Sequence, residues 1–349
     1  MSQDREKTAY LTLLSVCSMI AVVILHANVC FWSFSTEMYW VSANVIESVF
    51  YFAVPIFFMI SGATLLDYRE RYDTRTFLKK RALKTVIPFL FWGGFGMWFC
   101  ASVLHSAEWK GVLPLINGIL NVEYVGIYWF FLTLFALYGA IILLSLVPRE
   151  KKVKTFGWAA AVLFATSSAI PFFLTVFHTG IHWPLDPGSP THYLLYIFLG
   201  YYLSRKEIRL PYRVLSYVLA AAGLLLHILG TYYTSVQAGT IVSDYKGYLN
   251  LPCVLYAVGI FLFFKQHGNR VMRAFPGKII RVMAPYSFTV YLLHWYLLNL
   301  IRLSFANHGV MVDHALWYRL GSVFLIVPVC MLVGFIIRKT PVLRYLLPS

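Results

Sequence analysis

Charged side chains are scarce in this chain of 349 residues: Asp, Glu, Lys and Arg together make up 12%, whereas hydrophobic residues make up 60%. A soluble globular domain carries roughly 25% charged residues, so the composition argues against a water-soluble fold. The five cysteines contain no CxxC pair and all lie in or beside apolar segments, which leaves them as small packing residues. No long hydrophilic insertion interrupts the chain. We therefore expect a single membrane domain over residues 1–349 and no appended soluble catalytic domain.

Positive charge is in excess, with a formal net charge of +15. The Lys and Arg residues do not gather in one patch, as a nucleic-acid surface would require; they recur in short clusters between apolar stretches. This distribution is typical of the loops of a membrane protein, and no nucleic-acid partner is expected.

Apolar stretches near the length of about 20 residues needed to cross the hydrocarbon layer recur ten times. They lie at 9–32, 41–66, 82–104, 127–147, 155–177, 191–204, 212–234, 247–265, 284–304 and 316–337. The first is longer than a signal-peptide core and lacks a small-residue cleavage site, so we expect it to be retained as a helix. The sequence therefore predicts an all-α polytopic membrane protein with about ten transmembrane helices.

The basic residues fall mainly in every second connection between these stretches. All but four of the 29 Lys and Arg residues do so, the exceptions being Lys110, Lys246, Arg302 and Arg319. The main set begins with Arg5 and Lys7 and ends with Arg338, Lys339 and Arg344. Because positive charge is retained on the cytoplasmic side, both termini are predicted to be cytoplasmic.

Two ionisable residues lie inside the first two predicted helices. His26 and Glu47 are each about six residues below the outer end of their helix, which places both roughly 9 Å deep at 1.5 Å per residue. A carboxylate that bonds one imidazole nitrogen leaves the other free as a general base. Alternatively, His26 bonds a carbonyl and Glu47 pairs with a basic residue such as Arg302.

The second predicted helix ends in the apolar run 54–62, which closes with Ser61 and Gly62. Small residues at that position are typical of close helix packing. A basic cluster follows before the third helix and includes Arg75, Lys79, Lys80, Arg81 and Lys84. Such a cluster either holds phosphate groups through charge-assisted hydrogen bonds or anchors the protein to anionic lipid.

Two aromatic segments complete the set of candidate residues. Trp129 opens the fourth predicted helix, where aromatic residues ordinarily form an interfacial belt. Tyr291 and His294 are three residues apart in the ninth helix and therefore share one face. A buried hydrogen-bonded pair is the simpler interpretation of that spacing.

Taken together and in order, these segments resemble the acyltransferase-3 family of integral membrane acyltransferases. The residues that carry the resemblance are His26, the run Phe57-Phe58-Met59-Ile60-Ser61-Gly62, Arg81 with Lys84, Trp129-Phe130, and Tyr291-Leu292-Leu293-His294. The resemblance spans almost the whole chain, which looks most like the stand-alone members of bare membrane-domain length. Ser15 stands where the family often has Arg, and Lys84 stands where Arg is common, which keeps the charge but loses the bidentate fork.

What the resemblance implies is transfer of an acyl group, usually acetyl from cytoplasmic acetyl-CoA, to a hydroxyl of a sugar or cell-envelope glycan. It also implies a multi-pass protein of a bacterial cytoplasmic (inner) membrane, in contact with the lipid bilayer. The activity expected is that of an O-acetyltransferase acting in polysaccharide modification.

Site residues are expected on the same basis. The donor is expected to contact Ser61, Arg75, Lys80, Arg81, Lys84 and Trp129. The catalytic set is expected to be His26, Glu47, Tyr291 and His294. His26 either deprotonates the acceptor hydroxyl or transiently carries the acyl group, and Ser61, Tyr291 and His294 are candidates to stabilise the oxyanion. No metal site is expected.

Two other classes of protein suit the same sequence pattern. A transporter or flippase for a polysaccharide or a lipid-linked sugar would have a similar helix pattern, but it needs no CoA and tolerates a neutral replacement of His26. A membrane sensor or scaffold has no need to bury His26 and Glu47. The acceptor, the acyl group and the oligomeric state stay open.

Overall fold

The structure is a computed structural model that describes residues 8–184, 189–341 and 343–348. Over these residues the chain consists of helices and their connections, without a strand, so the predicted all-α class is confirmed. Arg5 and Lys7, which contributed to the predicted sidedness, lie outside the described residues.

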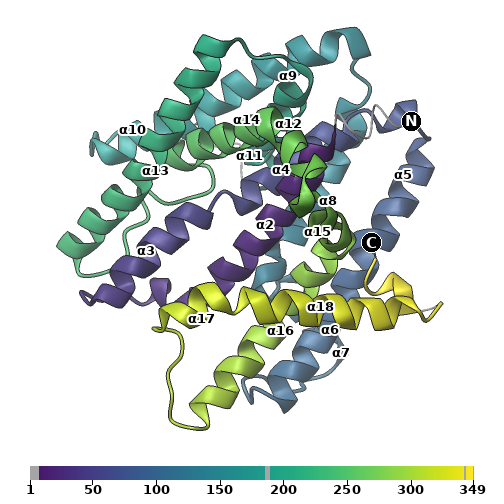
Figure 1. Cartoon of the computed structure of the whole chain (residues 1–349), viewed down its shortest axis with the longest axis vertical. Coiled ribbons are helices and arrows are strands. Elements are labelled where there is room, and N and C mark those ends of the chain that lie inside the picture. Colours follow the sequence, from purple (N-terminus) through teal and green to yellow (C-terminus); the bar gives the residue numbers. More distant parts are fainter. Residues whose placement is uncertain (1–7, 185–188, 342, 349) are drawn as a thin grey trace.

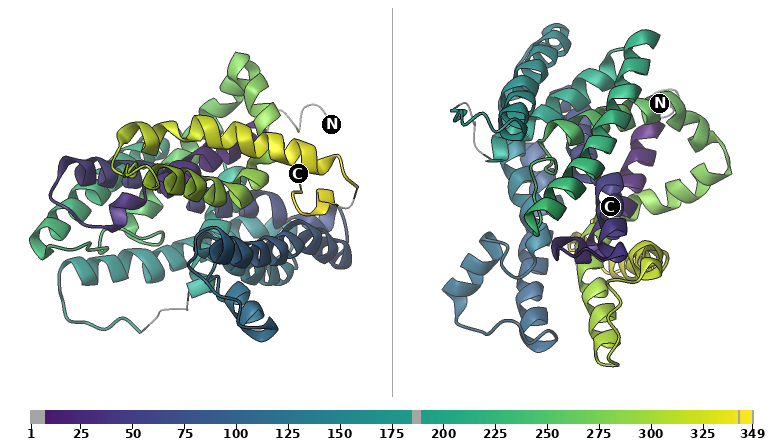
Figure 2. Two further views of the ribbon diagram at one scale, coloured as in Figure 1. Left: turned by 90° about the horizontal axis from the view of Figure 1, so that it is seen from below. Right: turned by 90° about the vertical axis from the view of Figure 1, so that its left-hand side faces the viewer.

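The helices follow one another along the chain as Figure 1 labels them. The first half contains α2 (Ala9–Ala27), α3 (Met38–Phe50), α4 (Ala53–Leu65), α5 (Thr74–Arg81), α6 (Ile87–Ser102), α7 (Val112–Leu120), α8 (Trp129–Leu144), α9 (Arg149–Phe164) and α10 (Ile170–Val176). The second half contains α11 (Ser189–His192), α12 (Leu194–Arg205), α13 (Leu210–Ala238), α14 (Leu251–Arg273), α15 (Phe275–Met283), α16 (Ser287–Ala306), α17 (Leu316–Gly321) and α18 (Val323–Arg338). In both views of Figure 2, α7 lies at the edge of the molecule.

Eight helical segments of the described chain are long and apolar enough to cross a membrane. They are Ala9–Ala27, Met38–Glu70, Thr74–Ser102, Gly126–Leu144, Arg149–Val176, Leu210–Ala238, Leu251–Arg273 and Leu316–Arg338. The two remaining predicted spans correspond to α12 and α16. The first has only 12 residues, and the second has 20 residues but a lower hydropathy because it carries polar residues such as His294 and Arg302. The chain is therefore a multi-pass membrane protein.

Two of the predicted spans contain interruptions with a local cause. The second is divided into α3 and α4 at Tyr51 and Phe52. Pro55 explains the break, because it has no N–H to bond the carbonyl of residue 51. The helical segment that contains the third predicted span, 82–104, begins earlier, at Thr74, after Asp73, whose carboxylate caps α5 by accepting from the Thr76 N–H at 3.0 Å. The segment then passes through a π-helical turn at Ala82–Val86 before α6. Lys84 lies in that turn.

The centre of the molecule is built around α2 and α4 (Figure 1). Residues of α2 belong to both large hydrophobic clusters, one shared with α4, α12 and α14 and the other with α6, α16 and α18. On α4, a Cβ added at Gly62 would lie 2.0 Å from the carbonyl oxygen of Ile197 in α12. Conversely, a Cβ added at Gly200 of α12 would lie 2.0 Å from the carbonyl oxygen of Met59 in α4. The backbones of α4 and α12 are therefore in direct contact, as the packing interpretation of Ser61-Gly62 predicts.

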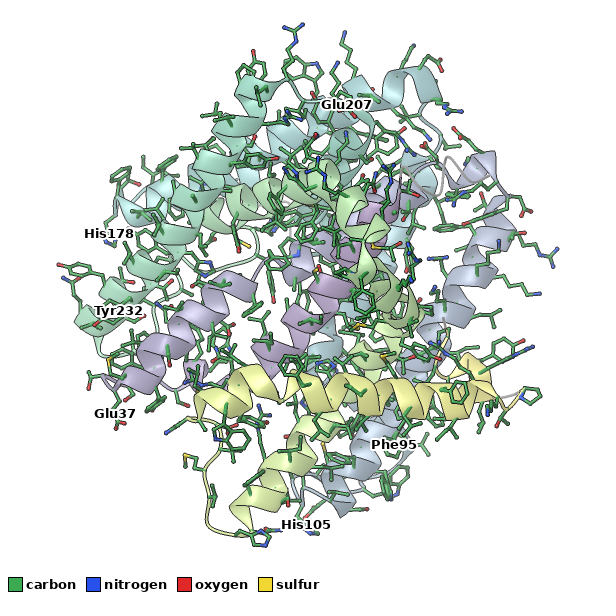
Figure 3. The ribbon with its side chains drawn as sticks, viewed as in Figure 1. Glu37, Phe95, His105, His178, Glu207 and Tyr232 are labelled. Carbon is green, nitrogen blue, oxygen red and sulfur yellow. The ribbon has the colours of Figure 1, made fainter. Side chains whose placement is uncertain are left out.

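The predicted external and internal connections separate in space. Glu37, His178 and His105, from three connections predicted to be external, lie along the left and lower edges of Figure 3, whereas Glu207, from an internal one, lies at the top. Below, "inner" means the side of Glu207 and "outer" the side of Glu37.

We predict that Gly62→Ala destabilises the protein by about 1–3 kcal/mol, the usual cost of overpacking. The reason is that the added methyl meets backbone atoms of α12, which cannot rotate away. Thermal unfolding of purified protein in nanodiscs measures the effect. Gly139→Ala in α8 is the matched control, because a Cβ there has nothing within 4 Å; equal stability of the two variants would contradict the contact.

Candidate functional site

A cavity of about 450 Å³ lies among α2, α3, α4, α8 and α16. Its wall along α2 runs from Ser15 to His26, a length of about 16 Å at 1.5 Å per residue. The other lining residues include Trp32, Glu47, Tyr51, Phe57, Trp129, Phe130, Tyr248, Ser287, Phe288 and Tyr291. The cavity therefore extends from the outer connection at Trp32 to the inner end of α16 at Ser287, and it carries a histidine and a carboxylate on its wall.

His26 and His294 form a direct pair at this cavity. Nδ1 of His26 is 2.9 Å from Nε2 of His294, and the ring centroids are 5.0 Å apart. His294 is fully buried on α16, whereas His26 keeps partial exposure on the cavity wall. The pair brings together the histidines of the first and ninth predicted helices.

The hydrogen bonds around His294 determine which nitrogen of each ring carries a proton. Nδ1 of His294 is 2.8 Å from the carbonyl oxygen of Val290, which only accepts, so this nitrogen carries the hydrogen. In the neutral ring Nε2 is then an acceptor, and Nδ1 of His26 must donate to it. No hydrogen bond among the described residues uses Nε2 of His26, so its lone pair is available, which is the form required of a general base.

Glu47 does not bond His26, and that hypothesis is wrong. Its Oε1 is 3.0 Å from Nζ of Lys246, and its Oε2 accepts from Nδ2 of Asn28 at 3.3 Å. Glu47 and Lys246 are both 4% exposed, so the two charges are compensated inside the protein. The orienting partner of His26 is a second imidazole because the carboxylate is already held by a buried cation.

Arg302, the basic residue considered as a partner for Glu47, has other contacts. Its Nε pairs with Asp313 at 2.8 Å, and its Nη2 donates to the carbonyl oxygen of His26 at 2.5 Å. That carbonyl belongs to the last turn of α2, where helical partners are missing. Arg302 therefore caps the helix that carries His26.

The three predicted oxyanion donors do not offer a free hydrogen in the described contacts. Tyr291 lines the cavity, but its hydroxyl donates to the carbonyl of Ile127 at 2.8 Å. Ser61 lies on α4, where its hydroxyl donates to the carbonyl of Phe57 at 2.9 Å. His294 uses Nδ1 on Val290 and accepts with Nε2. Trp129, which was predicted to contact the acyl donor, lines the cavity, and its indole N–H has no acceptor among the described hydrogen bonds.

The predicted phosphate-binding residues lie away from the cavity wall. Arg75 and Lys80 are exposed on α5, with the Lys80 ammonium 4.0 Å from the centroid of the Tyr72 ring. Arg81 and Lys84 are partly buried where α5 joins α6, and Lys84 is within electrostatic range of Arg81 and Arg338. They form a positive inner surface.

Lys246 is the main site residue that sequence reasoning missed. It comes from the connection between α13 and α14, and its Nζ lies 3.6 Å from the centroid of the Tyr51 ring and 5.2 Å from that of Trp32. Tyr248 of the same connection stacks on Tyr51 at 4.3 Å. Burial lowers the pKa of Lys246, while the Glu47 carboxylate acts to raise it. The signal available in the sequence was that Lys246 is one of only four predicted external basic residues.

Comparison with known proteins bears on what this cavity serves. A family model described as "Acyltransferase domain", that of the acyltransferase-3 family, matches residues 8–338. Proteins of Staphylococcus aureus strains MSSA476 and N315, each named "Probable poly-beta-1,6-N-acetyl-D-glucosamine export protein", are 23% identical over 326 residues, covering 86% of this chain and 84% of the relative. The protein of that name from strain MRSA252 is 23% identical over 316 residues with the same coverage. No solved structure matches the chain.

We predict that His26 is the tautomer protonated at Nδ1. Nitrogen NMR of protein carrying ¹⁵N-labelled histidine distinguishes the two tautomers, and the signal lost in His26→Gln assigns it. In His294→Phe the imidazole acceptor is gone and only the Val22 carbonyl remains as a hydrogen-bond partner of the His26 ring, so the preference for Nδ1–H should weaken in part. A wild-type His26 protonated at Nε2 in its neutral form would contradict the pairing.

We also predict that Lys246→Met lowers stability by about 3–5 kcal/mol, because it leaves the buried Glu47 carboxylate without its cation. The double variant Lys246→Met with Glu47→Gln should recover most of the loss, because no uncompensated charge remains. Thermal unfolding of the single and double variants measures both effects. A double variant no more stable than Lys246→Met would argue against the ion pair.

Proposed function

The chain belongs to the acyltransferase-3 family, and from this premise we propose that it is a membrane O-acyltransferase. It moves an acyl group, acetyl in our proposal, from acyl-CoA on the cytoplasmic side to a hydroxyl of a sugar or cell-envelope glycan. The observation that carries the proposal is the His26–His294 pair, which presents Nε2 of His26 at a cavity that extends through the bundle between Trp32 and Ser287. A bacterial cytoplasmic membrane is the proposed location, and the relatives named above are bacterial.

In the proposed reaction Nε2 of His26 removes the proton of the acceptor hydroxyl while the oxygen attacks the thioester carbonyl. The tetrahedral intermediate collapses to the ester, and the departing thiolate takes the same proton back from His26. His294 continues to accept from Nδ1 of His26 when His26 is an imidazolium, so the ring keeps its orientation throughout. Transient acylation of His26, followed by transfer to the acceptor, is the alternative route.

The negative charge of the intermediate requires a hydrogen-bond donor within the cavity. Among the cavity-lining residues Trp129 suits this role, because its indole N–H has no acceptor in the described contacts. The hydroxyl hydrogens of Ser61 and Tyr291 are already used on carbonyls. We therefore propose that Trp129, and not Ser61 or Tyr291, donates the hydrogen bond that stabilises the oxyanion.

A sugar acceptor is supported by the outer wall of the cavity. Trp32, Tyr51 and Tyr248 supply aromatic surface, and Glu47, held in place by Lys246, supplies a carboxylate. Apolar ring faces combined with a few fixed polar groups suit a polyhydroxylated ring, whose faces are apolar and whose edge is polar. Glu47 would accept hydrogen bonds from hydroxyls next to the one that reacts.

A second candidate is export of a polysaccharide, favoured by the names of the relatives at 23% identity. An exporter has no need of a free imidazole nitrogen fixed by a second histidine. The two functions differ in whether CoA is consumed and in whether His26 is required for the chemistry.

We predict that protein in nanodiscs transfers radiolabel from acetyl-CoA to a saccharide acceptor, tested over a panel of sugars and glycan fragments. His26→Ala should lower the rate by about 10²–10⁴-fold, the usual contribution of a general base. His267→Ala is the control, because this histidine is exposed on α14 and does not line the cavity.

Equal rates for wild type and His26→Ala would overturn the catalytic assignment of this histidine. No CoA binding and no transfer by folded wild-type protein would favour the export function.

A further inference from the structure

A groove of about 670 Å³ lies between α9 and α12. It shares no lining residue with the cavity at His26, so the proposed acyl transfer does not account for it. Most of its lining is apolar and includes Val153, Trp158, Ala161, Phe164 and Leu199. Its charged lining residues are Glu150, Lys154 and Lys206.

The charged residues all lie at the inner end of this α9–α12 groove. Glu150 and Lys154 are in the first two turns of α9, and Lys206 directly follows the last residue of α12. The neighbouring Glu207 lies at the inner edge of the molecule, at the top of Figure 3. The lining residues of α9 that follow Lys154 are at positions 157, 158, 161 and 164, which form one helix face. The groove therefore has a charged inner mouth and a mainly apolar interior.

The length of the groove matches one leaflet of a bilayer. From Lys154 to Phe164 it follows α9 for about 15 Å at 1.5 Å per residue, and the hydrocarbon core of a bilayer is about 30 Å thick. Only 17% of the apolar window of Arg149–Val176 is buried, the smallest share among the eight candidate spans of the described chain. Much of α9 is thus left for contact with lipid, and the occupant that fits the groove is a lipid of the inner leaflet.

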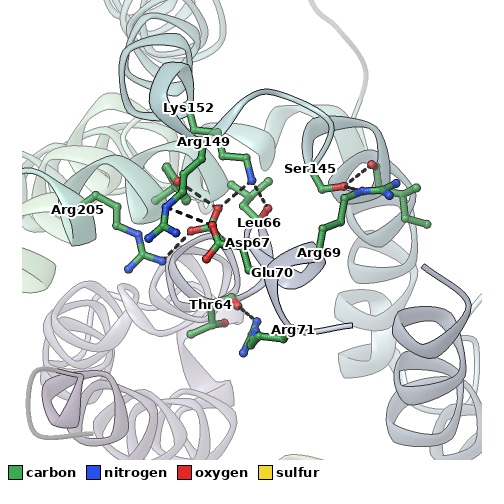
Figure 4. A network of polar contacts seen from close by, with 12 residues as sticks. Thr64, Leu66, Asp67, Arg69, Glu70, Arg71, Ser145, Arg149, Lys152 and Arg205 are labelled. Atoms are coloured by element: carbon green, nitrogen blue, oxygen red, sulfur yellow. Dashed lines mark hydrogen bonds and ion pairs between the residues drawn. The ribbon is translucent and has the colours of Figure 1, made fainter. Parts of the chain in front are cut away.

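The two lysines at the mouth have no carboxylate partner in the described contacts. Lys152, two residues before Lys154, is buried and pairs with Asp67 at 2.8 Å, as Figure 4 shows. Lys154 is exposed and takes no part in that network. The backbone carbonyl of Lys206 accepts from Lys265 at 2.9 Å, but its ammonium group has no acceptor among the described hydrogen bonds. A phosphate at the mouth can accept charge-assisted hydrogen bonds from both ammonium groups.

Glu150 places a negative charge at the same mouth, and this charge selects among phospholipids. It lies four residues before Lys154 on the same face of α9 and has no cation partner in the described contacts. A headgroup with a phosphate and an amine provides a partner for the carboxylate as well as for the lysines. A headgroup with a phosphate alone leaves the carboxylate beside an anion.

Tyr202 lies at the level between headgroup and acyl chains. It is four residues before Lys206, and its ring packs on α9 at Gly157, where an added Cβ would lie 2.9 Å from ring carbons of Tyr202. Its hydroxyl has no partner among the described hydrogen bonds. Tyrosine suits this level because its ring contacts apolar chains while its hydroxyl reaches polar groups. The hydroxyl can donate to an ester carbonyl of a glycerolipid.

We propose that the α9–α12 groove is a binding site for one molecule of phosphatidylethanolamine from the inner leaflet. The phosphate lies between Lys154 and Lys206, and the amine pairs with Glu150. An ester carbonyl accepts from Tyr202, and an acyl chain follows the apolar residues of α9 at positions 157–164.

Lipid titration followed by native mass spectrometry tests the phosphate contact. Lys154→Ala with Lys206→Ala should weaken binding of phosphatidylethanolamine about 25-fold, because each lysine at a membrane surface contributes about fivefold. Both side chains are exposed, so their removal leaves the core intact. The matched control is Lys151→Ala with Lys278→Ala, two exposed inner lysines that do not line the groove. Equal binding by the two double variants would overturn the site.

The same titration with phosphatidylglycerol of identical acyl chains tests the headgroup. Wild type should bind phosphatidylethanolamine more tightly. Glu150→Gln should weaken phosphatidylethanolamine about threefold, the effect of one exposed ion pair, and should strengthen phosphatidylglycerol. Preference of the wild type for phosphatidylglycerol, or tighter binding of phosphatidylethanolamine to Glu150→Gln, would overturn the assignment of the amine.

The position of the acyl chain is tested by filling the groove. Ala161→Trp places an indole where the chain is proposed to lie and should reduce binding of phosphatidylethanolamine at least tenfold. Val162→Trp is the control, because Val162 is 57% exposed and does not line the groove. Binding to Ala161→Trp as tight as to Val162→Trp would show that the chain does not lie in the groove.

Discussion

The hydrocarbon layer offers no water to a buried ionisable side chain, so the ionisable residues of the candidate site depend on partners from the protein. Two pairs meet that need, His26 with His294 and Glu47 with Lys246, and a third group, Asp67 with Lys152 and Arg205, lies just beyond the inner end of α4 (Figure 4). Each joins segments that are far apart in the sequence. The partners therefore fix the positions of α2, α3, α4, α9, α12 and α16 relative to one another, and with them the walls of the cavity at His26.

The central position of α2 follows from the same requirement. This helix contributes to both hydrophobic clusters, so most of its surface is covered by neighbouring helices. The remaining face, from Ser15 to His26, lines the cavity. An imidazole on a helix packed on its other sides has little freedom to move. Arg302 restricts it further by binding the carbonyl of His26, and such rigidity suits the general base that we propose.

The length of each apolar stretch predicts most of the fold, because the backbone groups of a membrane-spanning helix must form their hydrogen bonds within that helix. Length does not account for α12, which has only 12 residues and is held in place by the packing of Gly200 against α4. The break between α3 and α4 depends on a single residue, Pro55, and not on the apolar pattern. For the site, the sequence predicts that His26, Glu47, Tyr291 and His294 are important positions. The sequence does not predict that His26 pairs with His294 or that Glu47 pairs with Lys246. The position of a residue along its apolar stretch predicts its depth in the membrane, but it does not predict which neighbouring segment its side chain faces.

The separation of these partners along the chain has a consequence for biosynthesis. His294 follows His26 by 268 residues, and Lys246 follows Glu47 by 199 residues. The first two membrane segments emerge from the ribosome long before their partners exist. During that interval Glu47 is a carboxylate without its cation, a state that favours contact with water, lipid headgroups or an insertion factor over a place in the hydrocarbon layer. The His26–His294 pair that we propose as the catalytic centre is consequently absent from any chain that stops short of α16, so on our proposal acyl transfer begins only when insertion is nearly complete.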